Sequence, residues 1–411
     1  MNIQKIAASR LKPSKYNPRK DLKPSDPEYR KLKRSIEEFG YVEPIIWNER
    51  SGNIVGGHQR FKILLDLGET EIECVVVDLD AKRERALNVA LNKITGEFDI
   101  PMLTDLLLDL GTDGFDLSIT GFDVEELDEL FGVKDKNVHD DDFDLSAALE
   151  KAAFVLPGDV WILGRHRLMC GDATKPEDVA RLMDGKRANM CLTDAPYNVD
   201  IKGKAGKILN DNMPREQFYE FLLSAFKNIY EHLADGGAFY CFHSDSEKVN
   251  FFNATVDAGF HYSTTCIWVK DSLVLGRLDY QQRHEPCLYS WKKGAAHEWF
   301  SDRKQSSVWE FPRPKKSEYH STQKPVPLMA YPIQNSSQTN AIVLDPFSGS
   351  FSTGIACEQT NRVCYAMELD PKYASASIRR FVSEYSADGV FVERSGVITE
   401  YTEMAREVER E

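Results

Sequence analysis

The stretch Ala341-Ile342-Val343-Leu344-Asp345-Pro346-Phe347-Ser348-Gly349-Ser350 decides the fold of the larger part of this 411-residue chain. Its first four residues are apolar and predict a buried strand, and the small residues after Asp345 predict a tight turn. A helix is expected over 353–360 and a second strand over 363–367, which Glu368 follows. A strand, turn, helix, second strand and acid in this order are typical of a binding site for a nucleotide-like cofactor. Backbone N–H groups of the turn can approach the ligand, and the acid can accept hydrogen bonds from ribose hydroxyls.

A second motif, Asp194-Ala195-Pro196-Tyr197, comes about 150 residues earlier and follows the apolar run 189–193. That run predicts another strand ending at an acid. The Asp194 carboxylate and the backbone carbonyl of Ala195 or Pro196 can accept the protons of an exocyclic amine. Tyr197 can stack on a base that has been turned out of its helix. The motif therefore indicates a site that binds the exocyclic amino group of a nucleobase.

The region from about residue 153 alternates between strand and helix patterns. Residues 218–233 place apolar side chains on one helical stripe, and 238–243 is typical of a buried strand. Such alternation predicts an α/β, Rossmann-like fold with a mostly parallel sheet covered on both faces. Ligands in these sheets bind beyond the carboxyl ends of strands, where both motifs fall.

The chain divides by composition into three parts. Residues 1–132 predict a smaller α+β domain, with strands over 43–47, 53–55 and 73–77 and a helix over 58–67. Residues 133–152 predict an acidic linker, and residues 153–411 form the larger domain.

Charge is distributed unevenly along the chain. The net charge is −14, but residues 97–150 alone hold 17 Asp and Glu against Lys134 and Lys136. Residues 1–60 and 270–324 are locally basic, so global acidity does not exclude a nucleic-acid partner. The eight scattered cysteines predict reduced thiols and no metal site. No long apolar run or leader is visible, so we expect a cytoplasmic protein without a membrane partner.

Taken together, the two motifs resemble those of beta-class DNA amino-methyltransferases, in which the catalytic motif precedes the cofactor motif. The resemblance covers roughly residues 155–380 and implies S-adenosylmethionine as cofactor. In this family Asp-Pro-Pro-Tyr is the commoner tetrapeptide, and Ala195 replaces its first proline. The family pattern also has a glycine where this chain has Phe351. We therefore expect a less rigid motif at Ala195 and an altered turn at Phe351.

The resemblance assigns roles residue by residue. It implies catalysis by Asp194, Pro196 and Tyr197. It implies cofactor binding by Asp345, Phe347, Gly349, Ser350, Glu368 and Asp370, with Thr322 and Lys324 near the cofactor carboxylate.

The N-terminal domain resembles the ParB/sulfiredoxin-like nuclease fold over about residues 8–100. The resemblance rests on Asn17-Pro18-Arg19 and on the run 54–60, with support from 92–99. In ParB proteins the glycine turn and the helix start that follows bind a nucleotide's phosphates. Here Gly57 and Arg60 match that pattern. This favours a DNA-binding or regulatory domain and leaves nucleotide binding open.

A basic stretch with interleaved aromatic residues, about 270–320, is the candidate for target recognition. Arginine and glutamine read base edges, and lysine holds phosphates. The candidate DNA-binding residues are Arg277, Arg283, Arg303, Lys304, Gln305, Arg313, Lys315 and Lys316.

The sequence as a whole predicts a site-specific enzyme that methylates N6 of a flipped adenine in double-stranded DNA. A leading Asp favours adenine, since Ser is commoner in cytosine-N4 enzymes of the family. Cytosine-N4 methylation, a catalytically degenerate DNA-binding regulator and methylation of a non-DNA amine stay open as alternatives. A homodimer, a bacterial or phage setting and a restriction-modification context are compatible with the resemblance.

Overall fold

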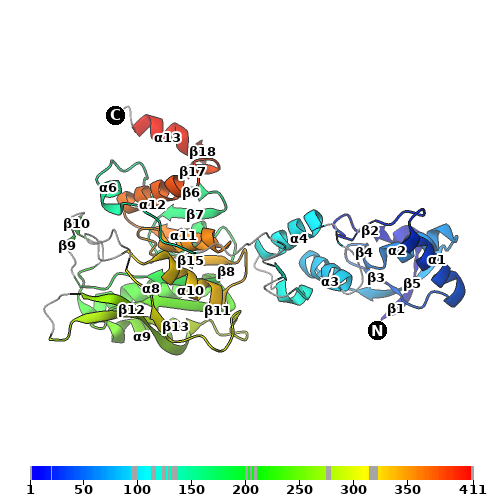
Figure 1. Cartoon of the computed structure of the whole chain (residues 1–411), viewed down its shortest axis with the longest axis horizontal. Coiled ribbons are helices and arrows are strands. Elements are labelled where there is room, and N and C mark those ends of the chain that lie inside the picture. Colours follow the sequence, from blue (N-terminus) through cyan, green and yellow to red (C-terminus); the bar gives the residue numbers. More distant parts are fainter. Residues whose placement is uncertain are drawn as a thin grey trace. The chain divides into compact units, whose positions relative to one another are not determined.

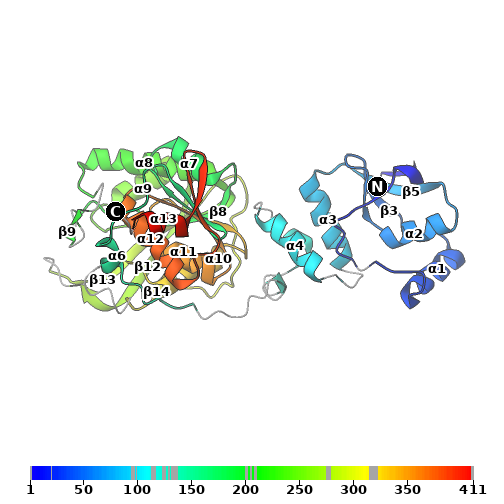
Figure 2. The same cartoon turned by 90° about the horizontal axis from the view of Figure 1, so that it is seen from above.

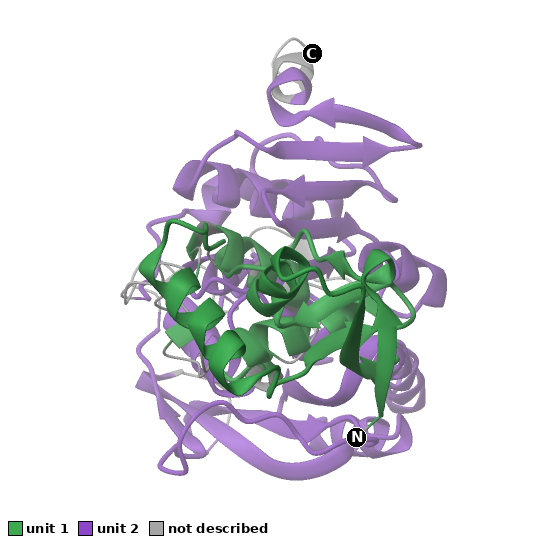
Figure 3. Ribbon diagram, turned by 90° about the vertical axis from the view of Figure 1, so that its right-hand side faces the viewer, with its two compact units in different colours: residues 1–134 green, residues 135–411 purple. Residues whose placement is uncertain are grey.

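The computed structural model describes residues 2–19, 21–93, 98, 100–112, 117–122, 126–127, 130, 138–199, 202–203, 206–207, 211–274, 279–313 and 323–408. The chain divides into two compact units, Met1–Lys134 (unit 1) and Asp135–Glu411 (unit 2), which Figure 3 colours separately. Four residues that the sequence singled out lie outside the described residues: Arg277, Lys315, Lys316 and Thr322.

Unit 1 is an α+β body built on a five-stranded sheet in the order β1-β5-β3-β4-β2. Its apolar core lies between this sheet and α2, and a second apolar cluster joins α3 to α4. The elements are β1 (Ile3–Ala7), η1 (Ala8–Arg10), β2 (Lys12–Pro13), α1 (Pro27–Phe39), β3 (Ile45–Asn48), β4 (Asn53–Gly56), α2 (His58–Asp66), β5 (Glu71–Val77), α3 (Ala81–Lys93), α4 (Ile100–Thr112) and η2 (Leu117–Thr120).

Unit 2 is built on an eleven-stranded sheet in the order β14-β12-β13-β11-β8-β15-β16-β7-β6-β17-β18 (Figure 1). The central neighbours β11, β8, β15, β16 and β7 run parallel, and antiparallel pairs extend the sheet on both sides. The strands are β6 (Val160–Leu163), β7 (His166–Cys170), β8 (Ala188–Asp194), β11 (Leu233–Phe242), β12 (His261–Val274), β13 (Gln282–Trp291), β14 (Val308–Glu310), β15 (Ile342–Asp345), β16 (Val363–Glu368), β17 (Val390–Arg394) and β18 (Val397–Glu400); the small pair β9 (Lys202–Gly203) and β10 (Gly206–Lys207) stands apart.

Helices cover both faces of this sheet. In Figure 2, α7, α8 and α9 lie above the strands, and α10, α11 and α12 lie below them. Met190 and Leu192 of β8 pack on the α10 side, whereas Cys191 between them packs on the α8 side, because successive strand residues point to opposite faces. The helices are α6 (Leu145–Leu149), α7 (Pro176–Met183), α8 (Arg215–His232), α9 (Lys248–Asp257), α10 (Val326–Ser336), α11 (Ser352–Gln359), α12 (Pro371–Glu384) and α13 (Tyr401–Val408).

The predicted fold class is confirmed, including the mostly parallel sheet covered on both faces. The strands and helices expected from apolar periodicity appear as β3, β4, α2, β5, β8, α8, β11, β15, α11 and β16. The stretch 133–152, predicted as a linker, contains α6, whose Leu145 and Ala148 pack with Ala376 of α12. None of the described helices is long and apolar enough to cross a membrane.

Phe351, the departure from the family pattern, lies in the apolar core of unit 2. Its φ of +67° is in the left-handed region that favours glycine, and its side chain is fully buried. The ring occupies the space beside Gly354, where an added Cβ would lie 2.2 Å from it. It also contacts Phe381 of α12 edge to face. The bulky side chain thus fills the core beneath the turn, at the cost of backbone strain.

Replacing this phenylalanine with glycine tests which of the two effects is larger. Phe351→Gly should relieve about 1 kcal/mol of strain but lose about 3–5 kcal/mol of aromatic burial. We therefore expect a lower unfolding temperature for unit 2, measured by differential scanning calorimetry. Ser395→Gly is the matched control, because Ser395 also has positive φ but is exposed. A Phe351→Gly protein as stable as the Ser395→Gly protein would contradict the packing role.

Candidate functional site

Three carboxylates end three neighbouring strands of unit 2. Asp194 is the last residue of β8, Asp345 of β15 and Glu368 of β16, and β15 lies between the other two strands. Because these strands are parallel, their carboxyl ends meet at one edge of the sheet. A cavity of about 590 Å³ opens there. It is lined by Asp194, Pro196, Tyr197, Lys324, Asp345, Phe347, Gly349, Ser350, Glu368 and Asp370 of the predicted site, together with Arg313.

The turn after β15 lies against Glu368. The Gly349 N–H donates to Oε2 of Glu368 at 2.8 Å, and the Asp370 N–H donates to Oε1 at 2.9 Å. Gly349 has a φ of +51°, and no atom lies within 4 Å of the position that a Cβ would occupy. Nearby, the Ser348 hydroxyl oxygen is buried and has no hydrogen-bond partner among the described residues. The turn therefore offers open backbone and a free hydroxyl beside an acid.

Among the described residues, no cation forms an ion pair with Asp345 or Glu368. Burial raises the pKa of Glu368 to about 7 and that of Asp345 to about 6. Asp345 accepts a hydrogen bond from the Thr193 hydroxyl at 2.8 Å, which partly offsets its burial. Uncompensated burial favours the neutral form of a carboxyl group. Both acids are therefore poised to change protonation near neutral pH.

Asp194, by contrast, holds a cation on one oxygen only. Its Oδ2 accepts from the Lys324 ammonium at 2.6 Å, while Oδ1 is buried and accepts no hydrogen bond from the residues that the structure describes. Burial raises the pKa of Asp194 above its usual value, against the opposing effect of Lys324. A buried acceptor without a donor is costly, so Oδ1 marks a place for a ligand's N–H.

Lys324 is the centre of a buried charge network. Its ammonium lies 2.6 Å from Asp194 and 3.0 Å from Glu285, and Lys270 lies 2.6 Å from the other oxygen of Glu285. Burial alone would raise the pKa of Glu285, but the ammonium groups of Lys324 and Lys270 outweigh it and lower that pKa to about 2. The Tyr197 hydroxyl donates to Glu285 at 3.0 Å. Two cations and two anions thus balance within the site.

This network gives Lys324 a contact that the sequence did not suggest. The resemblance implies a place near the cofactor carboxylate, and in the structure the Lys324 ammonium contacts Asp194. Lys270 and Glu285 were not singled out as site residues at all. No local motif marks them, since only the antiparallel pairing of β12 with β13 brings them together.

The described members of the predicted recognition stretch are placed differently from one another. Arg313 lines the cavity, and the Arg283 guanidinium donates to the Lys270 carbonyl at 2.8 Å. Arg303 and Lys304 are exposed. The Gln305 side chain is engaged at both ends, donating to Asp302 and accepting from Tyr331.

The glycine turn of unit 1 precedes α2. The His58 imidazole lies 2.8 Å from the Ser14 hydroxyl, and burial lowers the pKa of His58 to about 4. Arg60, which matches the ParB pattern, pairs with Glu43. Among the described residues of the chain, no cluster of His, Cys, Asp and Glu could hold a metal ion.

Part of the chain is similar to known proteins. The type II methyltransferase M.HpaI of Haemophilus parainfluenzae is 25% identical over 244 residues, covering 54% of this chain and 76% of that protein. The DNA adenine methyltransferase YhdJ of Escherichia coli K12 is 26% identical over 235 residues, covering 49% and 79%. Among solved structures, PvuII DNA methyltransferase (cytosine-N4-specific) is 14% identical with a TM-score of 0.44, covering 60% and 92%. The M1.HpyAVI structure is 23% identical with a TM-score of 0.40, covering 52% and 96%.

Three family models match separate parts of the chain. Residues 188–379 match the DNA methylase model of N6 and N4 methyltransferases, which spans Asp194, Lys324 and Glu368. Residues 1–93 match the ParB N-terminal domain, and residues 101–157 match the ParB-methyltransferase HTH domain, which sequence reasoning missed. The chain therefore contains a DNA methylase domain over residues 188–379, preceded by a ParB N-terminal domain over residues 1–93 and a ParB-methyltransferase HTH domain over residues 101–157.

Proposed function

We propose that this DNA methyltransferase transfers a methyl group from S-adenosylmethionine to N6 of a flipped adenine in double-stranded DNA. The observation that carries the proposal is Asp194 Oδ1, a buried acceptor with no donor among the described residues, in a cavity that also contains the cofactor-type turn. Two similar proteins support the proposed target base and cofactor. YhdJ is named as a DNA adenine methyltransferase, and an M1.HpyAVI structure is described as a complex with S-adenosylmethionine.

The cofactor side of the cavity fits S-adenosylmethionine. Glu368 is a suitable acceptor for ribose hydroxyls, and the open space at Gly349 allows close approach of the ligand to the backbone. The unpartnered Ser348 hydroxyl adds a polar group that a ligand can satisfy. When bound, the cofactor supplies an activated methyl group to the amine nitrogen and leaves as its neutral thioether.

The base side of the cavity holds and deprotonates the amine. Asp194 Oδ1 accepts one amine proton, and its raised pKa suits a group that takes up a proton as the new N–C bond forms. The Pro196 segment supplies a backbone carbonyl for the second proton. Tyr197 stacks on the base, and Glu285 fixes the orientation of its ring through the hydroxyl.

Lys324 and its partners hold the Asp194 carboxylate in one orientation toward the amine. The Lys324 ammonium holds Asp194 Oδ2, so the carboxylate cannot rotate freely and Oδ1 stays available to the amine. Glu285 and Lys270 in turn hold Lys324 and balance its charge. Such preorganised charges act strongly in a water-excluded site.

The alternatives are a cytosine-N4 enzyme and a degenerate regulator that binds DNA without catalysis. The leading Asp of the tetrapeptide favours adenine over cytosine. The regulator hypothesis rested on Ala195 and Phe351. Ala195 is buried within the tetrapeptide and its position still lines the cavity, whereas Phe351 lies in the core rather than in the cavity lining. Neither substitution removes a group that this mechanism needs. Arg313 at the cavity and the exposed Arg303 and Lys304 remain the candidates for DNA contact.

Methyl transfer should depend on Asp194. We expect Asp194→Asn to reduce incorporation of labelled methyl groups into unmethylated double-stranded DNA by about a hundredfold or more. The amino group of the target adenine then loses its charged hydrogen-bond acceptor. Digestion of the wild-type product to nucleosides identifies the base. N6-methyladenine supports the proposal, and N4-methylcytosine replaces it with the first alternative. Asp388→Asn, a change at an exposed acid, should leave activity intact. Full activity in Asp194→Asn would contradict the assigned role.

The charge balance around Lys324 should be measurable by a double-mutant cycle. Glu285→Gln leaves two buried ammonium groups facing one carboxylate, so it should lower the stability of unit 2 by about 3–5 kcal/mol and slow methyl transfer. Adding Lys270→Met restores the balance and should recover most of the stability. Scanning calorimetry and turnover assays measure the two effects. If Lys270→Met gives no recovery in the Glu285→Gln background, the buried charges are not balanced as described.

Binding of S-adenosylmethionine should strengthen as pH rises toward neutrality. The free protein holds Glu368 with a pKa of about 7, and ribose hydroxyls favour its ionised form, so binding lowers that pKa. Affinity should therefore rise from pH 5.5 to about 7 and then level off, which titration calorimetry can follow. Glu368→Gln should weaken binding and flatten this dependence. A wild-type affinity that falls with rising pH over this range would reverse the assignment.

A further inference from the structure

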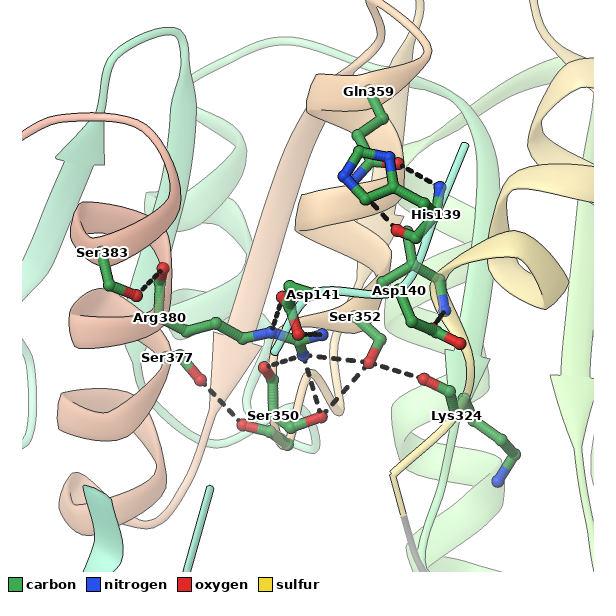
Figure 4. Close-up of polar contacts among 12 residues, drawn as sticks. His139, Asp140, Asp141, Lys324, Ser350, Ser352, Gln359, Ser377, Arg380 and Ser383 are labelled. Carbon is green, nitrogen blue, oxygen red and sulfur yellow. Dashed lines mark hydrogen bonds and ion pairs between the residues drawn. The ribbon is translucent and has the colours of Figure 1, made fainter. Parts of the chain in front are cut away.

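A short segment before α6, residues 138–141, is attached to the scaffold of the cavity. Asp141 forms two ion-pair hydrogen bonds with Arg380 of α12, from Nε to Oδ2 at 2.6 Å and from Nη2 to Oδ1 at 3.1 Å (Figure 4). The side chain of Arg380 is fully buried and that of Asp141 is 2% exposed. This bidentate geometry fixes both position and angle, because the guanidinium is a rigid planar fork.

The other nitrogen of Arg380 contacts the turn that lines the cavity. Nη1 donates to the Ser350 carbonyl at 2.7 Å and to the Ser352 hydroxyl at 3.1 Å. Ser350 is part of the cavity lining, and Ser352 begins α11. One rigid group therefore spans from Asp141 to the backbone of the turn. If Asp141 is lost, the guanidinium loses its bidentate ion pair, and its geometry is no longer set.

Two neighbours of Asp141 contact two further helices. The Asp140 carboxylate accepts from the Val326 N–H at 2.7 Å, at the start of α10, where Pro325 provides no side-chain cap. It thus satisfies a free N–H and places negative charge at a helix N-terminus. His139 and Gln359 of α11 exchange two hydrogen bonds, at 3.0 and 3.1 Å. Three consecutive residues therefore connect α10, α11 and α12.

The same contacts reach the base side of the cavity. The Ser352 hydroxyl donates to the Lys324 carbonyl at 2.9 Å (Figure 4). The Lys324 ammonium in turn holds Asp194. Arg380 therefore lies two hydrogen bonds away from the backbone of the residue that orients the proposed catalytic carboxylate.

We propose that residues 138–141 act as a positioning strap for the methyl-donor site, with Asp141 as a positioning residue that acts through Arg380 on the turn at Ser350. The inference rests on the proposed function, because it assigns S-adenosylmethionine to that turn. A strap that only stabilised the fold would affect every ligand through the folded fraction. A strap that sets the turn affects donor binding more than the binding of duplex DNA, because most contacts with duplex DNA go to its phosphates and sugars rather than to this turn.

The test compares full-length Asp141→Asn with Asp388→Asn, the same change at an exposed acid. Asp141→Asn should raise the Kd for S-adenosylmethionine by about tenfold, the size expected for an effect through a contact network, while the Kd for duplex DNA stays unchanged. Asp388→Asn should bind both ligands like the wild type. Arg380→Lys should behave like Asp141→Asn, because an ammonium cannot span both partners. Titration calorimetry and fluorescence anisotropy give the two constants.

A second measurement needs no variant. Linkage requires that a donor held by the strapped turn also stabilises the strap. In the wild-type protein, S-adenosylmethionine should therefore slow amide hydrogen exchange in peptides that contain His139 and Val326, which mass spectrometry can follow.

The outcomes separate the two levels of the proposal. Failure of the wild type to bind S-adenosylmethionine would remove the proposed function itself. If the wild type binds it, the strap is disproved by unchanged donor affinity in Asp141→Asn, by an equal loss of donor and DNA affinity, or by exchange at His139 and Val326 that the donor does not slow. A selective loss of donor affinity with slowed exchange supports it.

Discussion

The site depends on the parallel pairing of β8 with β15, across which the Thr193 hydroxyl donates to Asp345 at 2.8 Å. The two strands are about 150 residues apart in the sequence. Parallel neighbours bring their carboxyl ends to the same edge of the sheet. The proposed amine-binding motif that begins at Asp194 and the cofactor-type turn after Asp345 therefore meet there. The intervening chain adds β11, β13, β12 and β14 on the far side of β8 and so leaves this junction intact.

Three acids at that edge acquire different properties from their partners alone. Asp194 has the Lys324 ammonium on one oxygen, whereas Asp345 and Glu368 contact uncharged hydrogen-bond donors in the described part of the chain. Burial raises the pKa of all three acids, to about 6 for Asp345 and about 7 for Glu368, whereas at Asp194 the Lys324 ammonium opposes this effect. A cation beside a carboxylate maintains its charge, and dipoles alone do so less completely. The same residue type can thus accept from an amine at one strand end and from a sugar hydroxyl at another.

The sequence predicted strands, which depend on local residue patterns, but not contacts that form only when distant strands pair. Apolar periodicity predicts the strands that end at Asp194, Asp345 and Glu368, because their buried runs are short and bounded by turn residues. Lys270 and Glu285 carry no local signal, since their contact arises only when β12 and β13 pair.

Two other features escaped prediction for related reasons. The family pattern marked Phe351 as a departure, but a pattern cannot tell that the ring enters the core beside Gly354 instead of the cavity. The acidic composition of 133–152 is typical of a linker. A carboxylate whose partner is a buried arginine more than 200 residues away looks the same in sequence as a solvated one.

The donor side and the base side of the cavity share one scaffold. Arg380 contacts both Ser350 of the turn and the Ser352 hydroxyl, and that hydroxyl donates to the Lys324 backbone. Lys324 then holds Asp194 through its side chain. Methyl transfer needs donor and acceptor aligned within a fraction of an ångström, and rigid buried contacts achieve this at lower entropic cost than mobile loops. A shift of the turn therefore also shifts the residue that orients the amine acceptor, so the two half-sites keep their relative geometry.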